Sequence, residues 1–183
     1  RKTREILVSI WVTTPHELLF IRQQAIEAYK TEKCRLAAPW SMLLVTYPVF
    51  CDICSLIGKL SNIQDTFTTS WLKDRLYEVW GERPTLLYSV DKILQTLKFF
   101  GAIENVKAGE YKIKSQEITS QKAKQVLLSS LLQLKEKAYY DISELSCQPK
   151  LFPFIFAVSY EWLHNSDAFK LGNLGSKIVL MVE

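Results

Sequence analysis

The sequence has few of the residues on which common catalytic sites depend. It holds two histidines, four cysteines and six scattered glycines among 183 residues. It contains no H-E-x-x-H, no glycine-rich phosphate loop and no G-x-S-x-G, so metalloprotease, nucleotide-hydrolase and serine-hydrolase activities have no motif to support them. We expect no enzyme activity and no cofactor, with His16 and His164 at surface or boundary positions.

Uninterrupted long apolar runs are also missing. Residues 37–58 are long and apolar enough to be compared with a membrane span, but Pro39, Pro48 and Asp52 interrupt them. This pattern predicts two shorter buried helices separated at Tyr47. The first residues lack the apolar segment and cleavage site of a secretory signal, although the chain begins at Arg1 instead of Met. We expect a cytoplasmic protein with no membrane contact.

No part of the chain carries a strong charge of one sign. The net charge is +4, and residues 1–60, 61–114 and 115–183 contribute +3, +1 and zero. Binding to a phosphate backbone depends on clustered cations. A nucleic-acid surface on this chain would therefore have to place its cations on one face.

Cys51 and Cys54 form a C-x-x-C, a spacing found in redox and metal sites. The pair lies inside an apolar helical run, and no second closely spaced pair could complete a four-ligand zinc site. The sequence favours buried, reduced thiols and no metal.

What the sequence does contain is 48% hydrophobic and 12% aromatic residues, ample for a folded core. The fold class we predict is mainly α with small β (α+β).

The first third of the chain is expected to be helical. In residues 14–17, Thr14 is expected to cap a helix that runs to about Lys30, with Glu17 completing a capping box. Residues 5–11 suit a short strand or a helix start, residues 31–35 a turn, residues 40–46 a helix, and Pro48 opens another helix to about residue 60. Residues 62–66 are expected to be loop, and no internal repeat is visible.

Residues 69–114 carry the strongest pattern. A helix capped by Thr69 runs to Trp80, residues 81–84 form a turn, and a second helix runs to about Phe100. Gly101 stands where a helix C-terminal glycine belongs. Residues 102–106 and 110–114 then flank a short loop that ends in Gly109, as in a β-hairpin.

The last part of the chain predicts one long helix and little sheet. Residues 120–139 are amphipathic, Pro153 favours an edge strand or extended arm in residues 149–158, and a short turn or helix holds Trp162. Residues 177–183 suit a terminal strand, which we expect to pair with residues 155–158. The aromatic residues here are core or a partner surface, with core favoured.

The order of helix, helix, turn, helix and hairpin in residues 48–114 resembles a winged helix-turn-helix. Residues 90–103, "VDKILQTLKFFGAI", look like a recognition helix turning into a wing, with Leu97 and Gly101 at the matching positions. The resemblance implies three regions: helical residues 1–62, a winged helix-turn-helix in residues 63–118, and a C-terminal helix with short strands in residues 119–183. A similar layout occurs in helical-plus-winged accessory proteins of bacterial phage-defence systems.

The resemblance implies that the second helix of residues 69–100 enters the major groove of DNA. Its exposed face, the turn before it and the hairpin tip would contact duplex DNA through these residues: Arg83, Tyr88, Ser89, Lys92, Gln95, Thr96, Lys107, Lys112 and Lys114. The predicted function is that of a DNA-binding regulator or an accessory subunit of a bacterial DNA-processing or defence system. The alternative is a winged-helix module that binds a protein partner or a second copy of the chain.

Overall fold

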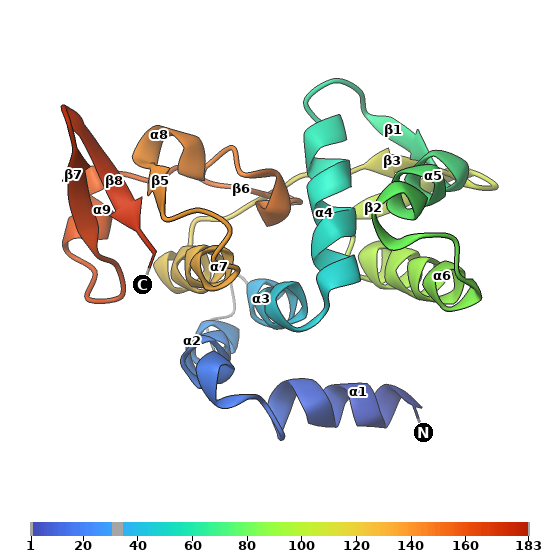
Figure 1. Cartoon of the computed structure of the whole chain (residues 1–183), viewed down its shortest axis with the longest axis horizontal. Coiled ribbons are helices and arrows are strands. Elements are labelled where there is room, and N and C mark those ends of the chain that lie inside the picture. Colours follow the sequence, from blue (N-terminus) through green and yellow to red (C-terminus); the bar gives the residue numbers. More distant parts are fainter. Residues whose placement is uncertain (1, 31–34, 183) are drawn as a thin grey trace. The chain divides into compact units, whose positions relative to one another are not determined.

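The computed structural model describes residues 2–30 and 35–182. Its fold is mainly α with small β, which confirms the predicted class. Contacts between residues divide the chain into two units (Figure 1). We call Pro48–Glu117 with Gln148–Ile155 the central unit, and Arg1–Tyr47 with Ile118–Cys147 and Phe156–Glu183 the terminal unit.

The central unit starts with helix α4, Pro48–Leu60, whose apolar stripe of Phe50, Ile53 and Ile57 is buried. Strand β1, Thr66–Thr68, leads into α5, Thr69–Trp80. The cap of α5 is Thr68, not the predicted Thr69: its hydroxyl accepts a hydrogen bond from the Trp71 amide at 3.2 Å. At the other end of α5, the Trp80 indole donates to Asp52 of α4 at 2.8 Å.

Helix α6, Pro84–Phe99, follows a turn in which Gly81 has a φ of 72°. Gly101, with a φ of 70°, ends the helix as predicted. Its amide bonds to the Lys98 carbonyl, and the Ala102 amide bonds to the Leu97 carbonyl. This pair of bonds satisfies carbonyls that the helix end would leave unpaired.

The predicted hairpin is present as β2, Ile103–Lys107, and β3, Glu110–Ile113, joined through Gly109 with a φ of 74°. Both neighbours of β3 are antiparallel to it, giving the sheet order β1-β3-β2. The prediction missed β1, since its three residues show no alternation of apolar and polar side chains. They form a strand only because they pair with β3. Phe67 of β1 is buried and stacks on Tyr111 at 5.4 Å between ring centroids.

The central unit also contains β4, Gln116–Glu117, and a later piece of chain, the 3₁₀ turn η3 (Pro149–Leu151) and strand β6 (Phe154–Ile155). Strand β6 runs parallel to β4, with Gln116 opposite Phe154. The predicted boundary at residue 118 lies one residue from the end of this part at Glu117, whereas the predicted boundary at residue 62 differs from the division. Helix α4 and residues 148–155 pack against the elements of residues 63–117.

The terminal unit contains α1 (Lys2–Trp11), the 3₁₀ turn η1 (His16–Leu18), α2 (Leu19–Tyr29) and α3 (Ala37–Thr46). Helices α2 and α3 pack against α7, Gln121–Gln133. The predicted capping by Thr14 was wrong, since its hydroxyl donates to the Ile10 carbonyl at 2.6 Å. The predicted turn at residues 31–35 lies mostly outside the described residues.

The C-terminal part of this unit differs from the prediction. Helix α7 ends at Gln133, before Lys135, whose φ is 51°, and residues 139–141 form strand β5 (Tyr139–Asp141). Helices α8 (Ile142–Leu145) and α9 (Tyr160–His164) precede β7 (Leu171–Leu174) and β8 (Lys177–Met181). The predicted pairing of the terminal strand with residues 155–158 was wrong: β8 lies between β5 and β7.

Among the described residues, no single helix is long and apolar enough to cross a membrane. Helices α3 and α4 would reach that length only if joined, and the chain breaks between them at Tyr47, as predicted.

Candidate nucleic-acid interface

Helix α6 presents two different faces. Leu86, Val90, Leu94 and Leu97 are buried in the central unit. Tyr88, Lys92 and Gln95 are exposed on other sides of the helix, with Tyr88 57% exposed. The helix therefore combines a buried core stripe with an exposed polar face.

The exposed face of α6 carries two kinds of polar group. The Lys92 ammonium lies 5.4 Å from the centre of the Tyr88 ring, a cation–π distance. Ser89 and Thr96 are half-buried, and their hydroxyls donate to carbonyls one turn back, at Thr85 and Lys92. Their hydroxyl protons are therefore occupied, whereas Lys92 and Gln95 extend into solvent.

Arg83 is exposed and precedes α6 directly, in an extended conformation with φ −141° and ψ 136°. Its neighbour Glu82 and the helix residue Asp91 are exposed carboxylates. Asp91 is held by Lys73 of α5 at 3.3 Å, which leaves Lys92 as the cation on this part of the helix.

The lysines of the β2–β3 hairpin are balanced by carboxylates of the same hairpin. Lys107 bonds to Glu110 at 2.9 Å and Lys114 to Glu104 at 2.6 Å, and Lys112 lies opposite Glu104 in the strand register. Hydrogen bonding to Lys114 lowers the pKa of Glu104, and hydrogen bonding to Glu110 raises the pKa of Lys107. The hairpin is thus close to neutral, and its surface ion pairs add little stability.

The nine predicted residues accordingly fall into three groups. Arg83, Tyr88, Lys92 and Gln95 lie exposed on α6 or directly before it. Ser89 and Thr96 of α6, predicted on the same exposed face, are half-buried. Lys107, Lys112 and Lys114 lie on or directly after the hairpin strands. All belong to the central unit. That unit carries ten Lys/Arg and nine Asp/Glu, so its net charge is only +1.

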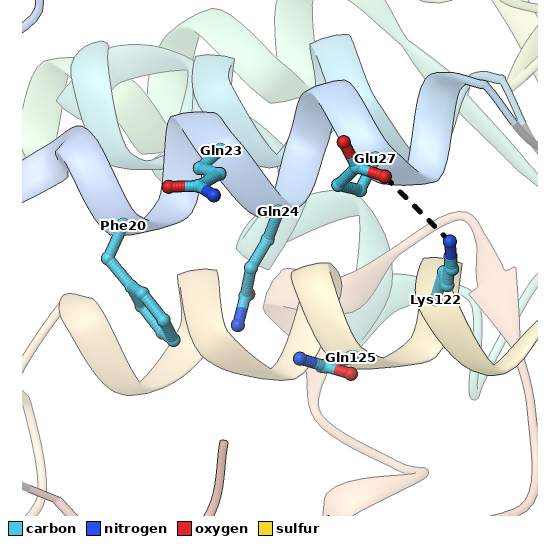
Figure 2. A pocket seen from close by; sticks show the side chains of 6 residues that line it. All are labelled: Phe20, Gln23, Gln24, Glu27, Lys122 and Gln125. Carbon is cyan, nitrogen blue, oxygen red and sulfur yellow. Dashed lines mark ion pairs between the residues drawn. The ribbon is translucent and has the colours of Figure 1, made fainter. Parts of the chain in front are cut away.

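Sequence reasoning missed a polar pocket of about 330 Å³ between α2 and α7 of the terminal unit (Figure 2). It is lined by Phe20, Gln23, Gln24, Glu27, Lys122 and Gln125. Figure 2 shows Gln24 pointing from α2 towards α7, and its carboxamide nitrogen and oxygen are buried without a protein partner. Glu27 and Lys122 face each other at 3.9 Å. The sequence offered no signal for this pocket, because it depends on two helices some 100 residues apart.

Cys51 and Cys54 are buried on α4 and are not joined in a disulfide. Burial, and to a lesser degree the neighbouring Cys51, raises the pKa of the Cys54 thiol. Such a thiol stays protonated at neutral pH and is a poor nucleophile. Within residues 2–30 and 35–182, no three His, Cys, Asp or Glu side chains are grouped as metal ligands.

Comparison of the chain with protein-family models, curated proteins and solved structures finds no match in any of the three. Function must therefore be inferred from the geometry of this chain itself.

Proposed function

We propose that the central unit is a winged helix-turn-helix that binds duplex DNA, with α6 in the major groove and the β2–β3 hairpin as the wing. The observation that carries this proposal is the topology: α4, β1, α5, α6, β2 and β3 in that order, with β3 between β1 and β2. A helix after a tight turn, followed directly by a hairpin, is the arrangement that places a recognition helix beside a wing.

The side chains of α6 suit both positioning and base contacts. Lys92 and Arg83 supply charge for phosphates or guanine, and Gln95 has the amide that pairs with adenine. Because Ser89 and Thr96 donate their hydroxyl protons within the helix, their role is to accept hydrogen bonds from the DNA. The protein acts in this proposal as a cytoplasmic regulator or an accessory subunit of a bacterial DNA-processing or defence system, without catalysis of its own.

Duplex binding is tested by fluorescence anisotropy of a labelled random duplex titrated with the full chain at several salt concentrations. The affinity should fall steeply with salt, since each phosphate contact releases about one counterion. Replacing Gln95 by alanine should then change the preference among sequences more than the affinity for random DNA. If the full chain shows no salt-dependent binding of duplex DNA, this proposal is wrong.

A second candidate is a winged-helix module that binds a protein. It is favoured by exposed apolar side chains on the central unit, with Val79 73%, Phe99 87% and Val106 56% exposed, and by the paired lysines of the hairpin. The apolar spacing of residues 69–80 predicts an inward position for Val79, which its exposure contradicts. Replacing Phe99 and Val106 by serine should leave DNA affinity intact if DNA is the ligand, and it should abolish self-association or partner capture if a protein is.

A further inference from the structure

The central unit's order of elements occurs a second time in the chain, with an insertion. Helix α7 is followed by β5, α8, α9, β7 and β8, as α4 is followed by β1, α5, α6, β2 and β3, except that η3 and β6 lie between α8 and α9. Both sets form a three-stranded antiparallel sheet in which the last strand lies in the middle, β1-β3-β2 and β5-β8-β7. We call residues 48–113 the first copy and residues 121–181 the second copy.

The spacing of the two copies agrees residue for residue over their first halves. Helices α4 and α7 begin at residues 48 and 121 and end at 60 and 133, and strands β1 and β5 span 66–68 and 139–141. Each boundary of the second copy lies 73 residues beyond its counterpart. Independent helices and strands have no physical reason to keep one offset through four boundaries.

Burial follows the same offset. Equivalent positions are buried in both copies: Phe50 and Ala123, Ile53 and Val126, Cys54 and Leu127, Phe67 and Tyr140, Leu72 and Leu145. Thr68 and Asp141, also equivalent, each cap the following helix through a side-chain oxygen. The hairpins turn at Gly109 and Gly175, which both have positive φ.

Sequence alone did not reveal this repeat. Between residues 48–73 and 121–146 only two aligned pairs are identical, Ser70 with Ser143 and Leu72 with Leu145. What the copies share is the pattern of burial, and apolar residues replace one another freely at such positions.

The copies differ where a winged helix would read DNA. Helix α6 has 16 residues, whereas its counterpart α9 has five. At 1.5 Å per residue these are about 24 Å and about 8 Å long, and only the former crosses a major groove about 12 Å wide. Helix α9 also exposes a carboxylate, Glu161, and the hairpin's Lys177 is bound by Asp141 at 3.0 Å.

The second copy has gained residues elsewhere. Three residues, 81–83, separate α5 from α6, but fourteen, 146–159, separate α8 from α9. Of these, Gln148–Ile155 belong to the central unit, and we call them the strap. Leu151, Phe152 and Phe154 of the strap are buried. A short loop of the first copy therefore corresponds to a packed core segment of the second.

The strap connects to the end of α6 through one residue. The Gln116 amide donates to the Pro153 carbonyl of the strap at 2.8 Å. The Gln116 side chain donates to the Phe100 carbonyl, at the end of α6, at 2.9 Å. Gln116 thus holds the last turn of α6 to the strap.

We propose that the chain is a tandem of two winged-helix copies, of which only the first reads DNA, while the second supplies a strap that positions the recognition helix through Gln116. Gln116 is a positioning residue in this arrangement. The inference rests on the proposed function for its DNA part and on the strap contacts for its structural part.

The test measures the affinity and salt slope of random-duplex binding for three variants of the full chain. Gln116→Leu removes the side-chain hydrogen bond to Phe100 and keeps the backbone amide that bonds to Pro153. Binding should therefore weaken about fivefold, which corresponds to the net free energy of one hydrogen bond, and the salt slope should stay unchanged. Lys170→Ala with Lys177→Ala removes cations beside and on the second hairpin and should change neither affinity nor slope. Lys92→Ala, as the comparison, should lower the slope by about one unit.

A second readout needs no DNA. Hydrogen exchange at the amides of Phe100, Gly101 and Ala102 should be faster in Gln116→Leu than in the unchanged chain, because the last turn of α6 loses its tether. Unchanged exchange, or unchanged affinity in Gln116→Leu, overturns the positioning role. A lower salt slope in the Lys170 and Lys177 variant overturns the assignment of DNA reading to the first copy. If the unchanged chain does not bind duplex DNA, the proposed function fails, and the exchange result still decides the strap.

Discussion

Gly58 of α4 lies directly against the backbone of Pro149 in the strap. A methyl group on Gly58 would overlap the Pro149 carbonyl oxygen and lie 2.8 Å from its carbon and 2.9 Å from its Cα. These obstacles are backbone atoms, which cannot move aside by a rotamer change. The helix thus has a glycine in its last turn because another segment of the chain passes there.

The first prediction follows from this contact. Alanine in place of glycine normally stabilises an exposed helix interior by about 1 kcal/mol. Gly58→Ala should have the opposite sign and lower the free energy of unfolding by about 1–3 kcal/mol, because the strap must move. Urea unfolding followed by circular dichroism measures it. The adjacent Lys59→Ala, on the exposed side of the same turn, is the control and should change little. A stabilised Gly58→Ala protein would mean that the strap does not pack here.

The second prediction concerns pH and Asp141. Hydrogen bonds from Ser143 and Lys177 lower the pKa of this carboxyl to about 2. A carboxyl whose pKa is lower in the folded protein than in the unfolded protein raises the free energy of unfolding at pH values above its unfolded pKa of about 3.9. This contribution is lost as the pH falls through the pKa of the folded state. The unchanged protein should therefore be more stable than Asp141→Asn at pH 6. The difference should shrink below about pH 4 and disappear near pH 2.

Unfolding curves of both proteins at several pH values measure this difference. Lys177→Met should remove part of the same stability, because it takes away one of the two partners of Asp141. A difference between the unchanged protein and Asp141→Asn that stays constant from pH 6 to pH 2 would contradict the assigned hydrogen bonds.

The third prediction concerns the hairpin carboxylates. Glu104 and Glu110 hold Lys114 and Lys107, so DNA must compete with them for these ammonium groups. Replacing both glutamates by glutamine should increase affinity for duplex DNA by about two- to fivefold at low salt. Replacing Glu27 and Glu161 of the terminal unit changes the net charge equally and is the control. Equal gains in the two variants would point to overall charge and not to the hairpin.

Much of the central unit was predictable from sequence, because its signals are local. The apolar stripe of α4, the turn at Gly81, the end of α6 at Gly101 and the hairpin at Gly109 were each expected and are confirmed. In every case the determining residues lie within a few positions of one another.

The missed features depend on residues far apart. Strand β1 exists because it pairs with β3, and β8 pairs with β5 and β7, whose three or four residues carry little pattern of their own. The long helix predicted for residues 120–139 ends early because Tyr140 is buried in that sheet. Of the candidate site, the sequence predicted the exposure of Tyr88, Lys92 and Gln95 on α6. It did not predict that Ser89 and Thr96 are half-buried or that two hairpin lysines are paired.

The central claim is that the cations of α6 and the hairpin contact DNA phosphates. The most direct measurement is the salt slope of random-duplex affinity for the triple variant Lys92→Ala, Lys107→Ala and Lys112→Ala, with its fold checked by circular dichroism. A second triple variant, at Lys30, Lys59 and Lys135, removes the same charge from surfaces outside the proposed site and serves as the control. We predict that the slope falls by about 2 to 3 units in the first variant and stays unchanged in the control. Equal slopes in the two variants, or an unchanged affinity in the first, would contradict DNA binding by the central unit and favour the protein-binding alternative.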